Sequence, residues 1–112
     1  MVSMNSCLEV TTVRGHQVVA IRGEIDLAVA DEVRDVLEQQ VASGGPVQVD
    51  CSEIASIDSR GLSSLICARY AASAAAVGFQ LLHVSEPMRR VLEAAGVEGL
   101  FDLAYRRDIA TR

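Results

Sequence analysis

The sequence predicts a single α/β domain with the element order β-β-α-β-α-β-α. A chain of 112 residues is long enough for one hydrophobic core and too short for two. Half of its residues are apolar and 22% are charged, a balance that is typical of a folded domain rather than a disordered one. Strand-like and helix-like apolar spacings alternate along the chain, and strands that are joined through helices are most easily parallel.

The first half of the chain predicts a hairpin followed by a helix. Strands are expected over Leu8–Val13 and Gln17–Arg22, with a turn at Arg14-Gly15-His16 between them. Apolar residues then recur at helical spacing from Val29 to Val41, and acidic residues take the opposite face. The segment Ser43-Gly44-Gly45-Pro46 is expected to end this helix.

The second half alternates strands and helices. A short strand is expected over Val47–Cys51, and an Ala-rich helix begins near Asp58 and ends at Gly78. Phe79–Val84 is expected as the next strand. A third helix follows, with Ser85 as its N-cap and Gly96 as its terminator. The single domain, 1–112, therefore has a core over about 8–103 and a polar C-terminal tail over 104–112.

Charge and hydropathy restrict the partners and the compartment. The chain has 10 basic and 15 acidic residues, and its net charge of −5 argues against nonspecific attraction to nucleic acid or to an anionic membrane. No apolar run approaches the roughly 20 residues that a bilayer crossing needs, and the start, MVSMNSCLEV, lacks the layout of an export signal. We therefore expect a cytoplasmic protein with a protein partner, without direct membrane insertion.

Neither the cysteines nor any known motif indicates a catalytic or metal site. Cys7, Cys51 and Cys67 form an odd set without a CxxC pair, so they are expected as reduced core residues, with a redox sensor as the alternative. No nucleotide-binding or zinc-protease motif occurs, and no cofactor or metal is expected. Cys51 ends a strand as a phosphatase nucleophile does, but Ile57 stands where the phosphate-binding Arg would lie.

The segment Ile57-Asp58-Ser59-Arg60-Gly61-Leu62 leads from a loop into the Ala-rich helix. Asp58 or Ser59 can accept a hydrogen bond from an unpaired N–H of the first turn, and the helix N-terminus favours negative charge there by about 0.3–1 kcal/mol. A phosphoserine would also fit at this place, because it adds close to two negative charges and strong acceptors. The alternative is that Asp58 and Ser59 only cap the helix.

Three segments together carry a resemblance to a known family. Gly23-Glu24-Ile25-Asp26, Asp50 and Asp58-Ser59-Arg60-Gly61-Leu62 resemble, in their order and separation, the STAS domain of bacterial anti-sigma-factor antagonists. The resemblance runs from about Leu8 to Leu103. It implies a small mixed sheet backed by helices and a binding module that acts by partner switching.

In that scheme the unmodified antagonist binds an anti-sigma factor with a histidine-kinase-like ATPase fold, and a sigma factor is released. The same anti-sigma factor can phosphorylate the antagonist, and a serine phosphatase then restores binding. The family's acceptor pattern is Asp-Ser-[Ser/Thr]-Gly, in which the hydroxyl directly before the Gly is modified. Arg60 stands at that position here, so Ser59 is only a fallback acceptor.

The resemblance also implies a partner-binding surface, which comprises Glu24, Asp26, Asp58, Ser59, Arg60, Gly61, Ser63 and Ser64, with Cys67 beside it. Because the helix dipole disfavours a cation at Arg60, we expect this side chain to pair with Asp58, Asp26 or Glu24, or to reach an acidic surface of the partner. Asp26 has a second interpretation as a simple helix cap. Ser63 and Ser64 can equally be polar residues of the first turns.

The sequence thus predicts an anti-sigma factor antagonist without catalysis, which either resists inactivation or is switched at Ser59 or by another signal. The alternatives are a STAS subunit of a lipid-type membrane transporter complex, a phosphorelay substrate modified at Ser59, and a hydrolase that uses Ser59 or Cys51. The oligomeric state stays open, because an edge strand can pair with a second copy or remain unpaired.

Overall fold

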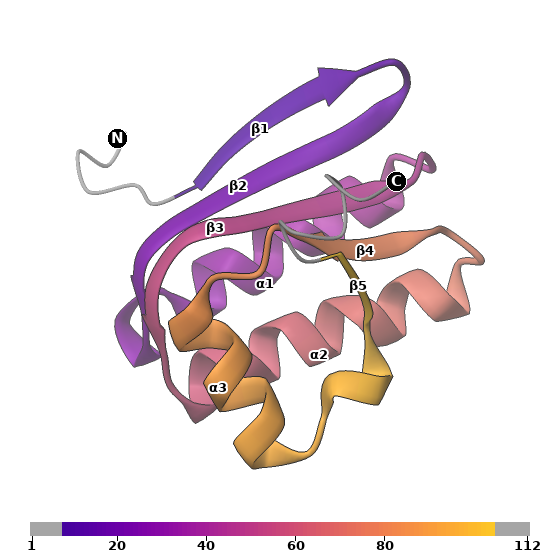
Figure 1. Ribbon diagram of the computed structural model, residues 1–112. Coiled ribbons are helices and arrows are strands. Elements are labelled where there is room, and N and C mark those ends of the chain that lie inside the picture. Colours follow the sequence, from indigo (N-terminus) through magenta and orange to yellow (C-terminus); the bar gives the residue numbers. More distant parts are fainter. Residues whose placement is uncertain (1–7, 105–112) are drawn as a thin grey trace.

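The computed structural model describes residues 8–104, which form one sheet with three helices on one side of it (Figure 1). Within the described residues the sheet has five strands, in the order β1-β2-β3-β4-β5. The strands are β1 (Leu8–Val13), β2 (His16–Ile25), β3 (Val47–Ile57), β4 (Phe79–Leu82) and β5 (Asp102–Ala104). The helices are α1 (Leu27–Ala42), α2 (Ser59–Ala74), α3 (Glu86–Ala95) and a 3-10 turn at Glu98–Leu100.

The strand directions follow from the connections. β1 and β2 form the predicted antiparallel hairpin, in which Val13 lies opposite His16. Arg14 and Gly15 both have positive φ, 53° and 83°, so these two residues make the tight turn and His16 already belongs to β2. The pairs β2–β3, β3–β4 and β4–β5 are parallel, since a helix joins the two strands of each pair. The α/β class and the element order up to α3 are confirmed.

The structure corrects several predicted boundaries: β2 continues to Ile25 instead of ending at Arg22, and β4 ends at Leu82 instead of Val84. β3 continues to Ile57 instead of ending at Cys51. The sequence pattern missed this extension because register shifts between β2 and β3 interrupt the alternation that a regular strand would show. Helix α2 ends at Ala74, and Ala76, with a φ of 58°, takes the left-handed conformation that was expected later, at Gly78. The short strand β5 was not predicted, and it includes Ala104, where the polar C-terminal tail was expected to begin. Residues 105–112 of that predicted tail lie outside the described residues.

The core lies between the sheet and the helices. Residues from every layer are at most 1% exposed, and they include Val19, Val49, Leu81, Leu37, Leu65, Met88 and Leu92. On α2 the small residues Ala68 and Ala72 are buried as well, which lets this helix lie close to its neighbours. The three helix caps that seat the helices on the sheet, Asp26, Asp58 and Ser85, each accept a hydrogen bond from their own helix.

The cysteines differ in their environments. Cys51 is fully buried, and this burial raises the pKa of its thiol far above the ordinary value, so it is an inert core residue as expected. The same expectation is wrong for Cys67, which is exposed on α2. Cys7 lies outside the described residues.

Candidate functional site

Two neighbouring parallel strands end side by side, and a helix begins directly after each of them. Ile25 of β2 pairs with Ile57 of β3. The next residues, Asp26 and Asp58, are the N-caps of α1 and α2, and each carboxylate accepts a hydrogen bond from a backbone N–H of its own helix, at 3.0 and 2.9 Å. The Asp58 N–H also donates to the Ile25 carbonyl oxygen at 3.1 Å. The N-termini of α1 and α2 therefore lie together at one end of the sheet.

Gly61 seats the first turn of α2 against the end of β2. A Cβ built on Gly61 would overlap the carbonyl oxygen of Ile25 and lie 2.9 Å from its Cγ2 atom. Because the obstacle is largely backbone, it cannot rotate away as a side chain would. The Gly of the Asp-Ser-Arg-Gly segment is thus a packing requirement, and it fixes the backbone of the residues before it.

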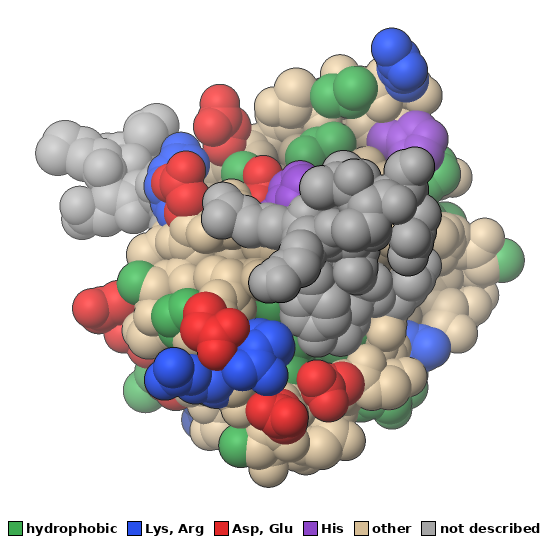
Figure 2. All heavy atoms as spheres, in the orientation of Figure 1, with side chains coloured by type: hydrophobic (Ala, Val, Ile, Leu, Met, Phe, Trp, Pro, Cys, Tyr) green, Lys and Arg blue, Asp and Glu red, His purple; other side chains and the backbone are tan. Residues whose placement is uncertain are grey.

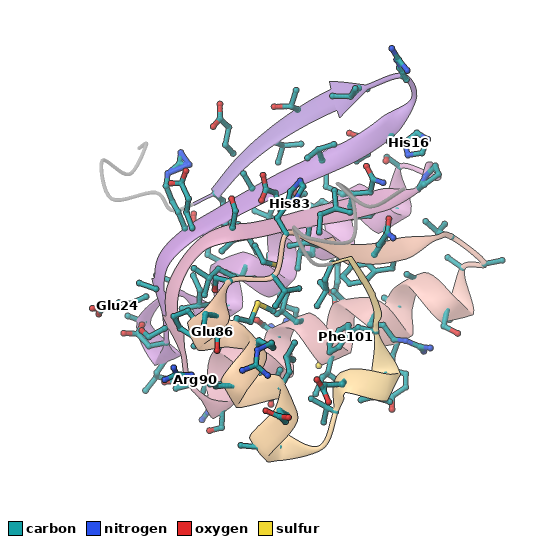
Figure 3. All side chains as sticks on the ribbon, in the orientation of Figure 1. His16, Glu24, His83, Glu86, Arg90 and Phe101 are labelled. Carbon is teal, nitrogen blue, oxygen red and sulfur yellow. The ribbon has the colours of Figure 1, made fainter. Side chains whose placement is uncertain are left out.

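The side chains of the predicted surface divide into exposed and buried ones. Exposed residues are Glu24, Asp58, Ser59, Arg60 and Ser63, whereas Asp26 is half-buried and Gly61 and Ser64 are buried. Figure 3 shows Glu24 near the end of β2, pointing away from the body of the protein. The Ser64 hydroxyl donates to the Gly61 carbonyl oxygen at 2.6 Å, so it stabilises the first turn of α2 instead of facing solvent.

We call the exposed segment Asp58-Ser59-Arg60 the elbow. Arg60 forms no ion pair with any of the described residues, 8–104. The predicted pairing of Arg60 with Asp58, Asp26 or Glu24 is therefore not seen. The elbow offers a hydroxyl, a carboxylate and a guanidinium group on a backbone that packing holds in place.

A small cavity of about 60 Å³ lies between α1 and α2 beside the elbow. Its lining comes from both helices and consists of Ala30, Asp31, Arg34, Arg60, Ser63, Ser64 and Cys67. Asp31 and Arg34 were not predicted as site residues, because the sequence pattern placed them on the solvent-exposed acidic face of the first helix. Leu27, the first residue of α1, was not predicted either, and its side chain is 63% exposed.

On α3, charged side chains pair with one another. Arg89 contacts Glu86 at 2.7 Å and Glu93 at 3.1 Å, and Arg90 contacts Glu86 at 3.4 Å. Hydrogen bonding and charge from Arg89 lower the pKa of Glu86 to about 2. Red and blue side chains lie side by side at this place in Figure 2, and Figure 3 labels Glu86 and Arg90 there. This patch has its charges balanced internally, unlike the elbow.

No helix within residues 8–104 is both long and apolar enough to span a bilayer. Across the same residues, no group of three or more His, Cys, Asp or Glu side chains is placed to hold a metal ion.

Comparisons with known proteins agree with the fold. Residues 8–103 match the protein family described as "Mlab, STAS domain", and no match was found among curated proteins. The chain is similar to an anti-sigma factor antagonist from Mycobacterium paratuberculosis, with 24% identity over 93% of this chain and 89% of that one and a TM-score of 0.79.

Two other solved structures are also similar to the chain. SpoIIAA of Bacillus, in its unphosphorylated form, is 18% identical over 94% of both chains, with a TM-score of 0.71. A sulfate transporter family protein from Wolinella succinogenes is 19% identical over 88% of this chain and 84% of that one, with a TM-score of 0.72. At these identities the likeness is one of fold.

Proposed function

This chain belongs to the STAS domain family, and we propose that it is an anti-sigma factor antagonist that acts by partner switching. It binds an anti-sigma factor with a histidine-kinase-like ATPase fold in the cytoplasm, and so releases a sigma factor for transcription. It is a binding module and performs no catalysis. The observation that carries the proposal is the exposed elbow at the N-terminus of α2, beside the N-terminus of α1.

The rigidity of the elbow suits a docking surface. The seat of Gly61 against Ile25 and the cap made by Asp58 hold the backbone before binding. The elbow therefore loses little conformational freedom when a partner docks on it, which favours affinity. Glu24 and Ser63 are exposed nearby and extend the surface that a partner can contact.

Regulation depends on which hydroxyl remains. Arg60 stands directly before Gly61, where the family carries its phosphoacceptor, and a guanidinium cannot be phosphorylated. Ser59 is exposed at the elbow and is the remaining acceptor there. The chain is therefore either an antagonist that the kinase cannot inactivate, or one that is switched at Ser59 and restored by a serine phosphatase.

Incubation of the purified protein with ATP and a candidate anti-sigma factor of the kinase-like ATPase fold, taken from the same organism, tests both forms. Mass spectrometry measures added phosphate, and calorimetry measures binding. Tight binding without added phosphate supports the constitutive form. One phosphate that is lost in Ser59→Ala but kept in Ser73→Ala, a control at an exposed serine near the other end of α2, supports the switched form. An absence of binding contradicts the proposed function.

A second function is a STAS subunit of a lipid-type membrane transporter complex. The family description, "Mlab, STAS domain", and the similarity to a sulfate transporter family protein favour it as the alternative. The same calorimetric assay distinguishes the two functions. Affinity for a transporter ATPase or permease encoded beside the gene, without affinity for an anti-sigma factor, would establish the transporter role.

A further inference from the structure

We propose that the groove between α1 and α2 receives an acidic side chain of the partner protein, held between Arg34 and Arg60. This inference rests on the proposed function only in taking the partner to be a protein that docks at this end of the sheet. We call this cavity the α1–α2 groove; it has a volume of about 60 Å³.

Both helices contribute a line of residues to the groove. Asp31 and Arg34 of α1 are spaced by three, and Arg60, Ser63 and Cys67 of α2 are spaced by three and four, so each set shares one helix face. All five residues line the cavity. The two arginines therefore stand on opposite walls of a single depression that begins at the elbow.

The arginines of the groove have weak partners or none. Arg34 lies 3.7 Å from Asp31 and 3.9 Å from Asp35, and these two carboxylates are 87% and 65% exposed. Ion pairs this long and this exposed contribute little to stability. Arg60 makes no ion pair within residues 8–104. By contrast, Arg89 on α3 holds Glu86 at 2.7 Å.

A carboxylate fits these two groups best. A guanidinium can donate two parallel hydrogen bonds to a carboxylate, and such charge-assisted bonds are the strong ones. Asp31 lines the same groove, and its charge disfavours the larger negative charge of a phosphate. Leu27 lies one turn before Asp31 on the same face of α1, and its 63% exposed side chain offers an apolar contact beside the groove. An acidic segment of a protein, carrying an apolar residue nearby, matches this surface.

Cys67 provides a probe that needs no partner, because its exposed thiol lies in the groove whereas Cys51 is buried. In a Cys7→Ser background, we would measure the alkylation rates of Cys67 by iodoacetate, a carboxylate, and by neutral iodoacetamide at low ionic strength. The rate with iodoacetate divided by the rate with iodoacetamide should fall at least threefold in Arg34→Gln/Arg60→Gln, because the arginines that attract the anionic reagent are gone. The same ratio should stay unchanged in Arg14→Gln, an exposed site in the β1–β2 turn. An unchanged ratio in the double variant would overturn the proposal.

The purified complex with the partner provides the second arm. Binding should slow the alkylation of Cys67 by iodoacetamide at least fivefold, and Arg60→Glu should weaken binding at least tenfold. Replacement of one acidic partner residue by Arg should recover most of that loss. A partner that binds without protecting Cys67 would end the groove proposal and leave the proposed function intact. If the alkylation ratio depends on the two arginines but no anti-sigma factor binds, the proposed function fails and the groove proposal stands.

Discussion

The carbonyl oxygen of Ile25 lies where a side chain on Gly61 would have to be, and it also accepts a hydrogen bond from Asp58 at 3.1 Å. One backbone group at the end of β2 therefore fixes both the end of β3 and the start of α2. The residues between Asp58 and Gly61 are held from both sides while their side chains face solvent. This relationship gives the elbow a fixed shape.

Gly61→Ala should destabilise the protein by about 1–3 kcal/mol, the usual cost of overpacking a closely packed site. Urea unfolding followed by circular dichroism measures the change. Gly99→Ala is the matched control, because a Cβ there would have no neighbour within 4 Å. Equal stabilities of the two variants would show that α2 is not seated against Ile25 in the way described.

Asp58→Ala should cost about 1 kcal/mol of stability, since it leaves an N–H of the first turn of α2 without its acceptor. Asp58→Asn should remain close to wild type, because Asn caps a helix about as well as Asp does. Chemical denaturation of both variants checks the pair. If Asp58→Asn lost as much stability as Asp58→Ala, the cap would not be the source of the effect.

The two neighbouring serines should behave differently. Ser64→Ala removes a buried hydrogen bond of 2.6 Å to the Gly61 carbonyl and should destabilise by about 0.5–1.5 kcal/mol. Ser63→Ala changes an exposed side chain and should stay within about 0.5 kcal/mol of wild type. Thermal melts of both variants under one condition measure this. A larger loss of stability in Ser63→Ala than in Ser64→Ala would contradict the assignment of Ser64 as the buried serine.

Glu86 should make stability depend on acid pH. Its pKa is lowered from 4.5 to about 2 in the folded protein, first by the hydrogen bond from Arg89. A depressed folded pKa stabilises the protein above the unfolded pKa, and this stabilisation is lost as pH falls from about 4.5 towards 2. The stability difference between wild type and Glu86→Gln should therefore shrink as the pH falls across this window. A constant difference would contradict the assignment.

Native thiol labelling should separate the cysteines. In a Cys7→Ser variant, one thiol, Cys67, should react within minutes with a maleimide, while Cys51 should react only after denaturation. Peptide mapping of the labelled protein identifies the site. Rapid native labelling of Cys51 would mean that the core of the sheet opens far more readily than its packing indicates.

Local chemistry explains which parts of the fold could be predicted from the sequence. The starts of α1, α2 and α3 were predictable because Asp26, Asp58 and Ser85 each cap their own helix, which requires no distant residue. The extension of β3 was not, because it depends on register shifts against β2 that only the paired strands define. The strand β5 is three residues long, too short for its period to be recognised.

The site shows the same division. The elbow could be located from the sequence, since its residues are contiguous and their capping chemistry is local. The exposure of Cys67 could not, because small and apolar residues occur around much of α2 and leave no clear polar face. The approach of Arg34 to Arg60 could not either, since it depends on how α1 packs beside α2.

The most direct test of the account is the affinity of the purified protein for candidate anti-sigma factors of the kinase-like ATPase fold from the same organism, measured by calorimetry for wild type, Arg60→Glu and the control Arg14→Glu. We predict that wild type and Arg14→Glu bind equally well, and that Arg60→Glu binds at least tenfold more weakly although its free energy of unfolding is no lower, because an acidic residue suits the first turn of α2. Equal binding by all three proteins would contradict the claim that the exposed elbow is the docking surface.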